Sequence, residues 1–154
     1  MLDQCTNEER WNGVNGLIER WLQERQEMIV QFCAVSGADD DAPQTKQSKQ
    51  DVEKFCQILV DYVSSGHFEV YYQLIREAEE FEDGSADVAK ALLPQIIAST
   101  EAAMEFNDKY TDDNSDQADL KKNISKLGEI LEARFELEDQ LISIMHESHR
   151  AQEA

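Results

Sequence analysis

The chain has 154 residues, of which 41% are apolar and 31% are charged, with only six glycines and two prolines. This length is typical of one domain with its own core, and so few turn-forming residues argue against an all-β fold. Thirty-three acidic residues against fourteen basic ones give a net charge of −19. That charge argues against binding to bare DNA or RNA, and it favours either a solubilising surface or attraction to a basic protein.

Other features of the chain indicate a soluble cytoplasmic protein. No apolar run approaches the roughly 18 residues of a membrane-spanning helix. The N-terminus, MLDQCTNEERW, has neither the basic start nor the apolar stretch of a secretory signal. The three cysteines contain no C-x-x-C pair, and their odd number disfavours a disulfide framework. We therefore expect a protein of the reducing cytoplasm that does not enter membranes.

A capping box at Thr6–Glu9 predicts the start of the first helix. Apolar residues then recur at alternating steps of three and four, which predicts an amphipathic helix of roughly 30 residues that Gly37 ends. This stripe is interrupted at Arg25 and consists of Trp11, Val14, Ile18, Trp21, Met28, Phe32 and Val35. Residues 38–50 are polar and aperiodic, so they are predicted to form a loop.

Two shorter helices are predicted next. Ser48 is a candidate cap for the second helix, whose apolar stripe covers Val52–Val63 and which is predicted to end at Ser64–Gly66. The third helix is predicted to begin near His67 and to end at the turn Asp83–Gly84.

The fourth predicted helix opens at Ser85 and Asp87 and contains a proline. Pro94 removes a backbone donor and clashes with the preceding turn, so we expect the helix to be kinked or split there. Its continuation to about Tyr110 has a predicted inward stripe of Ile97, Thr100 and Met104.

Residues 111–117 form a second predicted loop, and the last helix follows from about Ala118 to Ser148. Its apolar residues keep a heptad-like register, and it would span roughly 45 Å. They are Leu120, Ile124, Leu127, Leu131, Leu141 and Met145. The tail, residues 150–154, is predicted to fray.

These elements predict an all-α protein. Because an isolated amphipathic helix is unstable, the apolar stripes must bury one another. We expect a single domain over residues 1–154, folded as a four-helix-type up-and-down bundle. The first and last helices are long, and one member is kinked or broken near Pro94.

Three charged residues occupy seam positions of the predicted helices: Arg25 in the first, and Arg134 and Glu138 in the last. Arginine and glutamate are rarely buried without a partner. Three interpretations remain open. The three residues could form an internal ion-pair network. They could lie at the edge of the apolar stripe, which shifts around the helix because 3.6 residues per turn do not divide seven. They could also line a polar cleft that binds a ligand.

The sequence contains no candidate catalytic or metal site. Di-iron bundles need paired Glu-x-x-His motifs, and none of the three histidines has a glutamate three residues before it. His146 and His149 lie near the chain end, where a simple surface role is expected. His67 begins a helix, unlike the mid-helix histidine of a phosphorelay domain. We therefore expect no enzyme, no cofactor and no metal.

Three segments resemble a known family. They are Glu19–Leu22 (ERWL) with Arg25, residues 55–68 (FCQILVDYVSSGHF) and residues 131–139 (LEARFELED). Together with an N-terminal MLxQ, they resemble the Rsd/AlgQ family of regulators of the housekeeping sigma factor. The resemblance covers the first, second, third and last predicted helices in order, and it is weak over residues 76–116.

The resemblance implies that the chain binds the C-terminal region of the housekeeping sigma factor, the basic helix-turn-helix that reads the promoter −35 element. Binding would keep sigma from core RNA polymerase and from the promoter, in a complex of about 1:1 with a monomeric regulator that contacts no nucleic acid directly. The alternative is a bundle that senses a small anion between Arg25, Arg134 and Glu138, and that acts as an adaptor for another regulatory protein.

Asp61 is the residue whose interpretation changes most with this resemblance. It lies two residues after Leu59, which points it away from the core, and such an acid is usually only solvated. The resemblance implies instead a direct contact to a sigma arginine or lysine. The other predicted partner-binding residues either frame this contact or brace a cleft beside it. They are Trp21, Arg25, Gln57, Tyr62, His67, Phe68, Arg134 and Glu138.

Overall fold

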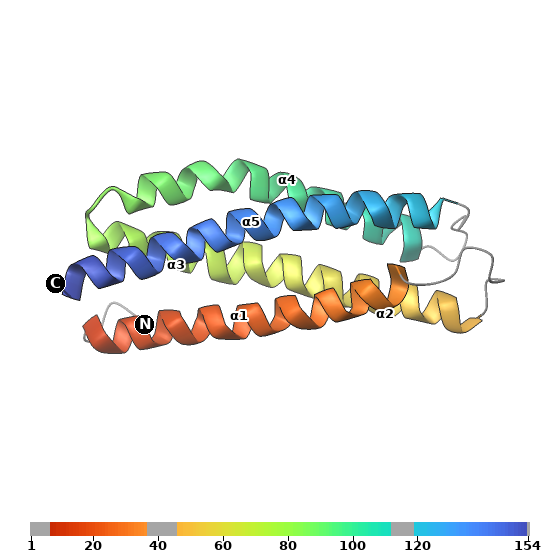
Figure 1. Cartoon of the computed structure of the whole chain (residues 1–154), viewed down its shortest axis with the longest axis horizontal. Coiled ribbons are helices and arrows are strands. Elements are labelled where there is room, and N and C mark those ends of the chain that lie inside the picture. The colour runs from red at the N-terminus through yellow and green to blue at the C-terminus, as the bar shows by residue number, and fades with distance from the viewer. Residues whose placement is uncertain (1–6, 37–45, 112–118, 154) are drawn as a thin grey trace.

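The computed structural model describes residues 7–36, 46–111 and 119–153, and their side chains except those of residues 7–10, 46–49, 67, 68, 111, 152 and 153. The described part is helical, in the order α1 (Asn7–Ser36), α2 (Lys46–Ser65), η2 (Gly66–Val70), α3 (Tyr71–Phe81), α4 (Ser85–Thr111) and α5 (Leu120–Glu153). Figure 1 shows four rods side by side, with α2, η2 and α3 forming one of them. Successive rods run in opposite directions, which confirms the predicted all-α bundle.

The rod formed by α2, η2 and α3 continues past the predicted end of the second helix. α2 ends at Ser65, within the predicted Ser64–Gly66, but the backbone stays right-handed and helical at Ser65, Val70 and Tyr71. The Tyr71 amide donates to the Gly66 carbonyl, which makes residues Gly66–Val70 a single π-helical turn. Such turns insert one residue into an α-helix and often occur at functional sites. The Ser-Ser-Gly sequence therefore marks the end of α2 but not the end of the rod.

The turn between α3 and α4 lies where the sequence predicts it. Glu82 adopts a left-handed conformation with φ of 53°, and Gly84 follows with φ of 85°. The Ser85 amide donates to the Asp83 carboxylate at 3.0 Å, which caps the first turn of α4.

Three helix boundaries differ from the prediction. α2 begins at Lys46, so Ser48 lies inside the helix and the predicted loop 38–50 ends earlier. α4 continues from Ser85 to Thr111 through Pro94, so a split there is wrong, and the kink stays a prediction. α5 extends to Glu153, beyond the predicted end near Ser148, and the fraying of residues 150–154 stays a prediction.

A ring contact joins the end of α5 to the beginning of α1. The Trp11 ring of α1 stacks on His149 at 3.9 Å between centroids and meets the edge of His146 at 5.3 Å. Both histidines therefore pack against α1, which corrects the simple surface role expected for them.

The core runs along the whole bundle and includes Ile18, Phe55, Leu59, Leu74 and Leu141. In α4 the buried stripe is shifted by one residue from the prediction. Its members are Ile96, Ser99, Ala103, Phe106 and Tyr110, whereas Ile97, Thr100 and Met104 are half-buried. The apolar pattern did not predict this register, because the register places a serine, Ser99, in the core.

Among the described residues, no helix is both long and apolar enough to cross a bilayer. That part of the chain also contains no group of three or more His, Cys, Asp or Glu side chains arranged to hold a metal ion.

A candidate partner-binding surface and the network beneath it

An acidic hollow opens where α1 faces α2 and η2. It has a volume of about 420 Å³. Of the seven described residues that line it, four are acidic and none is basic; they are Glu24, Glu27, Ile58, Asp61, Tyr62, Ser65 and Glu69. A concave surface with charges of one sign raises the local potential and attracts ions of the opposite sign. We call these residues the acidic hollow.

Asp61 stands on α2 with its side chain exposed, as its spacing from the buried Leu59 predicts. Ser65, one helical turn later, also lines the hollow and is half-buried. Gln57, one turn earlier, is exposed but lies outside the lining.

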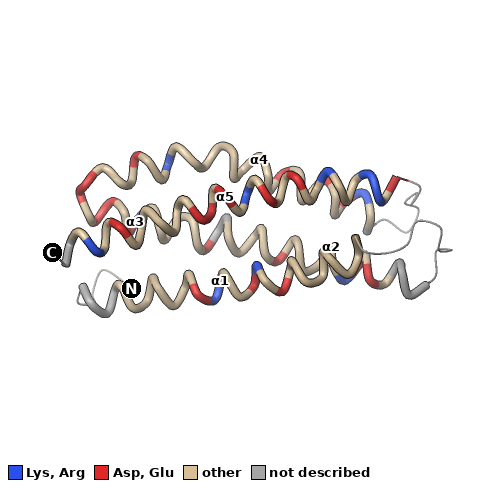
Figure 2. The backbone as a smooth tube through the Cα atoms, viewed as in Figure 1, with Lys and Arg blue, Asp and Glu red and all other residues tan. Residues whose placement is uncertain are grey.

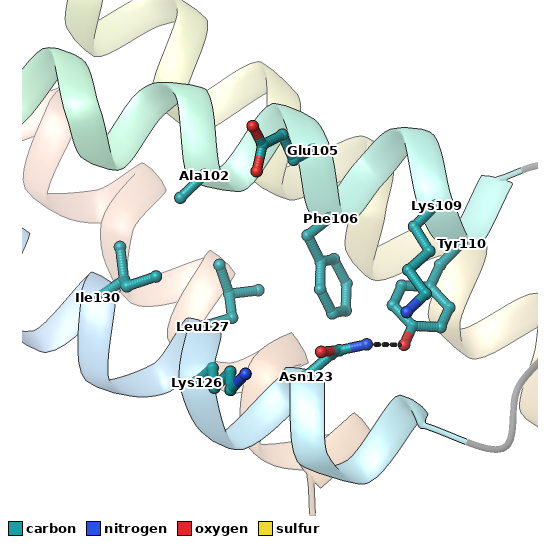
Figure 3. Close-up of a pocket in the computed structure, with 9 residues that line it drawn as sticks. All are labelled: Ala102, Glu105, Phe106, Lys109, Tyr110, Asn123, Lys126, Leu127 and Ile130. Carbon is teal, nitrogen blue, oxygen red and sulfur yellow. Dashed lines mark hydrogen bonds between the residues drawn. The ribbon is translucent and has the colours of Figure 1, made fainter.

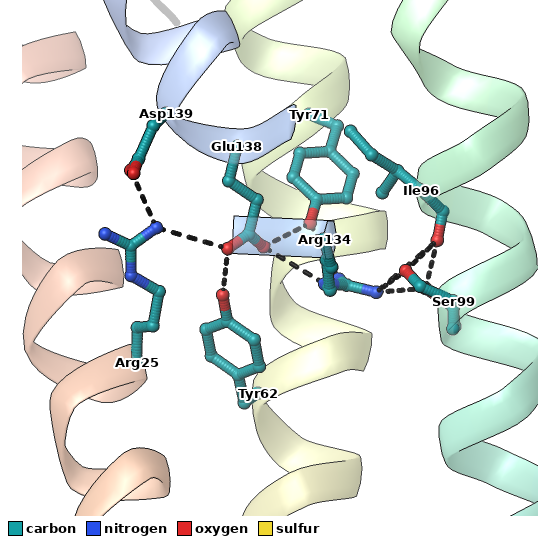
Figure 4. A network of polar contacts seen from close by, with 9 residues as sticks. Arg25, Tyr62, Tyr71, Ile96, Ser99, Arg134, Glu138 and Asp139 are labelled. Carbon is teal, nitrogen blue, oxygen red and sulfur yellow. Dashed lines mark hydrogen bonds and ion pairs between the residues drawn. The ribbon is translucent and has the colours of Figure 1, made fainter. Parts of the chain in front are cut away.

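Tyr62 connects the acidic hollow to the interior of the bundle. It lines the hollow but is only 2% exposed. Its hydroxyl donates to Glu138 Oε1 in α5 (Figure 4). Tyr62, which lies in the wall of the hollow, is thus hydrogen-bonded directly to the buried Glu138 carboxylate.

Glu138 is the centre of a buried polar network (Figure 4). Its Oε2 accepts from the Tyr71 hydroxyl at 2.7 Å and from Arg134 Nε at 3.1 Å. Its Oε1 accepts from Tyr62 and lies 3.5 Å from Arg25 Nη1. Two cations and two hydroxyls therefore compensate one carboxylate that is 0% exposed.

Arg134 extends the network to α4. It is 0% exposed, and Nη1 donates to the hydroxyls of Ser99 at 2.9 Å and Thr100 at 2.7 Å and to the Ile96 carbonyl at 3.5 Å. Nη2 donates to the Tyr71 hydroxyl at 2.7 Å. Each of the three guanidinium nitrogens is thus occupied by the protein itself.

The network joins all four rods, which confirms the internal ion-pair interpretation of the charged seam. Arg25 comes from α1, Tyr62 from α2, Ser99 from α4, and Arg134 and Glu138 from α5. The interpretation that these charges lie at a stripe margin is wrong for Arg134 and Glu138, since both are fully buried. Nothing in this geometry favours a bound anion.

Arg25 lies at the outer end of the network. Its side chain is 18% exposed, and Nη1 pairs with the Asp139 carboxylate at 2.9 Å as well as with Glu138. Its guanidinium also lies 5.2 Å from the centre of the Phe135 ring. Arg25 therefore ties α1 to the surface of α5 and to the buried carboxylate.

Gly66 allows the π-turn to approach this network closely. A Cβ at Gly66 would lie 3.1 Å from the Tyr71 hydroxyl, 3.3 Å from Arg134 Nη2 and 3.3 Å from Trp21 Nε1. Trp21 is 1% exposed and packs edge-on against the Tyr71 ring at 5.3 Å. Its Nε1 has no hydrogen-bond partner among the described residues. The glycine therefore provides space for a crowded set of polar groups.

Replacing Gly66 by alanine should lower the free energy of unfolding by about 1–2 kcal/mol, because the added methyl crowds three fixed atoms. Gly16→Ala is the matched control, since Gly16 lies in α1 with nothing within 4 Å of its Cβ position. There alanine should stabilise the helix by about 0.5–1 kcal/mol. Urea unfolding of both variants measures the difference, and equal effects would contradict the crowding.

The network also predicts how stability depends on alkaline pH. Burial, and then the Glu138 carboxylate, raise the pKa of Tyr62 and of Tyr71 far above their ordinary value of about 10. The unfolded chain releases these protons near pH 10, whereas the folded chain keeps them. The unfolded state then binds fewer protons, so the free energy of unfolding should fall as pH rises above about 10.

Tyr62→Phe should reduce this alkaline slope by up to about 1.4 kcal/mol per pH unit, the contribution of one tyrosine. Thermal unfolding of the parent protein and of Tyr62→Phe measures the two slopes between about pH 8 and 11, the range around the ordinary tyrosine pKa. Identical slopes for the two proteins would show that the pKa of Tyr62 is the same in the folded and the unfolded chain.

The comparison with known proteins identifies the family. The family described as "Regulator of RNA polymerase sigma(70) subunit, Rsd/AlgQ" matches residues 1–146. The chain belongs to the Rsd/AlgQ family. A "Regulator of sigma D" from Yersinia pseudotuberculosis is 37% identical over 147 residues, which are 93% of this chain and 87% of that protein. A "Regulator of sigma D" from Enterobacter sp. is 36% identical over 149 residues, which are 94% of this chain and 89% of that protein. No solved structure matches the chain.

In this Rsd/AlgQ protein the predicted partner-binding residues fall into distinct groups. Asp61 and Gln57 are exposed, and Tyr62 borders the acidic hollow from inside. Three others are buried and brace the bundle: Trp21, Arg134 and Glu138. The backbones of His67 and Phe68 lie in the π-turn, but their side chains lie outside the described residues.

Sequence reasoning missed part of both sites. Glu24 and Glu27 of α1 share the acidic hollow with Asp61, and only the packing of α1 against α2 brings them together. Tyr71, Ser99 and Thr100 complete the network, and no periodicity marks a serine or a threonine as the partner of a buried arginine.

Proposed function

We propose that this Rsd/AlgQ protein binds the C-terminal region of the housekeeping sigma factor, the region that reads the promoter −35 element. In the complex, sigma is kept from core RNA polymerase and from the promoter. The family description supports regulation of the sigma(70) subunit, and the names of the relatives support the same role.

The acidic hollow is the observation that carries this proposal. A protein module that holds DNA phosphates presents lysine and arginine side chains on its surface. The hollow offers Glu24, Glu27, Asp61 and Glu69 within one concavity, so it is complementary in charge to such a module. Binding there would cover the cations that otherwise contact the promoter.

The regulator acts by occupying a surface, without chemistry of its own. The Glu138 carboxylate is fully buried, where it accepts a hydrogen bond from Arg134 and reaches no external molecule. Exposed carboxylates such as Asp61 remain for electrostatic contact. We accordingly expect a monomeric cytoplasmic protein that forms a 1:1 complex and needs no cofactor.

Calorimetry with the isolated C-terminal region of sigma tests the proposal. We expect a complex of about 1:1 in low-salt buffer, with an affinity that falls about tenfold or more when salt approaches 0.3 M, since exposed charges are screened. A sigma fragment without the C-terminal region is the control and should not bind. Absence of a complex in low salt, or equal binding of the control fragment, would refute the proposed partner region.

A second measurement tests the mechanism. Sigma that carries the bound regulator should not be retained by immobilised core polymerase, whereas free sigma should be. Formation of a ternary complex would mean that the regulator acts in another way.

A further inference from the structure

A second pocket opens between α4 and α5 and differs in chemistry from the acidic hollow. It has a volume of about 210 Å³ (Figure 3). Its floor is mostly apolar and includes Ala102, Phe106, Leu127 and Ile130. Its other lining residues are Glu105, Lys109, Tyr110, Asn123 and Lys126. We call it the α4–α5 groove.

Two lysines flank this groove from opposite helices. Lys109 comes from the end of α4 and Lys126 from the beginning of α5, and both are exposed. Figure 2 shows basic residues at this end of α4 and α5, with acidic residues among them. The described lining of the groove carries these two lysines and one carboxylate, Glu105, in a chain of net charge −19.

Among the described residues, neither lysine forms an ion pair of the kind that Arg25, Arg134 and Lys90 make. In this respect they resemble other exposed bases, such as Arg20 and Lys54. Across the described part of the chain, neither Lys109 nor Lys126 is paired with a carboxylate, although Glu105 borders the groove. Lys109 Nζ lies over the Tyr110 ring at 5.6 Å instead. Both cations are thus available to an external anion.

The arrangement fits a peptide better than a small anion. Sites for small ligands need several polar groups that converge on one point. Here Asn123 Nδ2 already donates to the Tyr110 hydroxyl, and the remaining floor is apolar (Figure 3). An apolar centre with charged groups at its rim is the usual anatomy of a protein–protein contact.

We propose that the α4–α5 groove docks an acidic segment of a second protein. One apolar side chain of that segment enters between Phe106, Leu127 and Ile130, and flanking carboxylates pair with Lys109 and Lys126. The acidic hollow uses α1, α2 and η2, so the two sites share no helix. Their opposite charge selects different partners, and both sites can be filled at once.

Titration of the isotope-labelled full chain by NMR tests this proposal, with the blocked peptide Ac-Glu-Glu-Phe-Glu-Glu-NH2 as probe. We expect saturable shifts confined to residues 102–110 and 123–130 in low-salt buffer. Lys109→Glu/Lys126→Glu should weaken binding about tenfold or more, because two attractions become repulsions. Arg20→Glu/Lys54→Glu, with the same change of charge at exposed positions of α1 and α2, should leave binding unchanged.

Three further probes separate the alternatives. A peptide with serine in place of phenylalanine, a peptide with lysine in place of glutamate, and phenylacetate should each bind much more weakly. If the lysine peptide binds equally well, or phenylacetate reproduces the shifts at equal affinity, the groove does not select an acidic segment. Shifts spread over the whole surface, or no shifts at all, overturn the proposal as well.

One control concerns the acidic residues that follow α4 in the sequence. Asp112, Asp113 and Asp116 are replaced together by asparagine. If only this variant binds the probe, the occupant is the chain's own segment and a second protein is excluded. The test is independent of the sigma proposal, since Lys109→Glu/Lys126→Glu should retain sigma binding.

Discussion

Glu138→Gln is expected to lower the free energy of unfolding by about 3–5 kcal/mol, the usual effect of removing one member of a buried ion pair. The substitution keeps the size of the side chain but removes its charge. Arg134 would then be fully buried without a carboxylate, and arginine cannot escape by losing its proton. Arg25 would lose less, because Asp139 remains 2.9 Å away.

Urea unfolding followed by circular dichroism measures this loss. Glu136→Gln, an exposed position two residues earlier in α5, is the matched control and should change stability by less than about 0.5 kcal/mol. A loss below about 1 kcal/mol for Glu138→Gln would mean that water compensates Arg134, and that the network is not the buried brace described above.

Removing both charges provides a second check of the same argument. Arg134→Met/Glu138→Leu eliminates the unpaired cation, so it should be more stable than Glu138→Gln. It should not regain full stability, because the hydroxyls of Tyr62 and Tyr71 lose their shared acceptor. If the double variant is as unstable as Glu138→Gln, the loss in free energy of unfolding comes from packing and not from an unpaired charge.

The sequence predicts the bundle because its apolar residues repeat with helical period, and it predicts the network because charges interrupt that period. Arg25, Arg134 and Glu138 are conspicuous in a seam for this reason. Their partners are not conspicuous. Ser99 is a small polar residue on α4 whose hydroxyl donates to the Ile96 carbonyl of its own helix, and only the packing of α5 against α4 brings Arg134 to it as a donor.

The π-turn shows a different limit of sequence reasoning. Ser-Ser-Gly is a common helix terminator, so the prediction of an end at Ser64–Gly66 follows ordinary propensity. α2 does end at Ser65, but the chain continues in the same rod as a π-turn, which local propensity does not predict. Gly66 is placed beside Tyr71, Arg134 and Trp21, where a Cβ would lie only 3.1–3.3 Å from their side chains. A local rule cannot include contacts from three other helical segments.

The acidic hollow could be predicted only in part. Asp61 follows from its spacing on α2 and from the family motif, whereas Glu24 and Glu27 belong to α1, and their position relative to α2 depends on helix packing. The same packing sets Tyr62 between the hollow and Glu138. A partner that touches the hollow would therefore meet a surface that is hydrogen-bonded, through Tyr62, to the four-rod network.

Asp61→Arg is expected to weaken binding of the sigma C-terminal region by about 10- to 100-fold, since reversing one charge of a complementary pair costs roughly 2 kcal/mol or more. The fold should be unaffected, because Asp61 is exposed. Its free energy of unfolding should stay within about 0.5 kcal/mol of the parent protein. Calorimetry at low salt and urea unfolding measure the two quantities.

Glu101→Arg separates a local contact from the general field. Glu101 is exposed on α4, outside the acidic hollow, and its replacement changes the net charge by the same two units. If the hollow is the contact surface, Glu101→Arg should weaken binding only slightly, by the long-range attraction that salt screens. If Asp61→Arg and Glu101→Arg weaken binding equally, sigma is attracted by the overall charge of the protein and not by a local contact at the hollow. Loss of folding in Asp61→Arg would instead assign that carboxylate to the structure of the bundle.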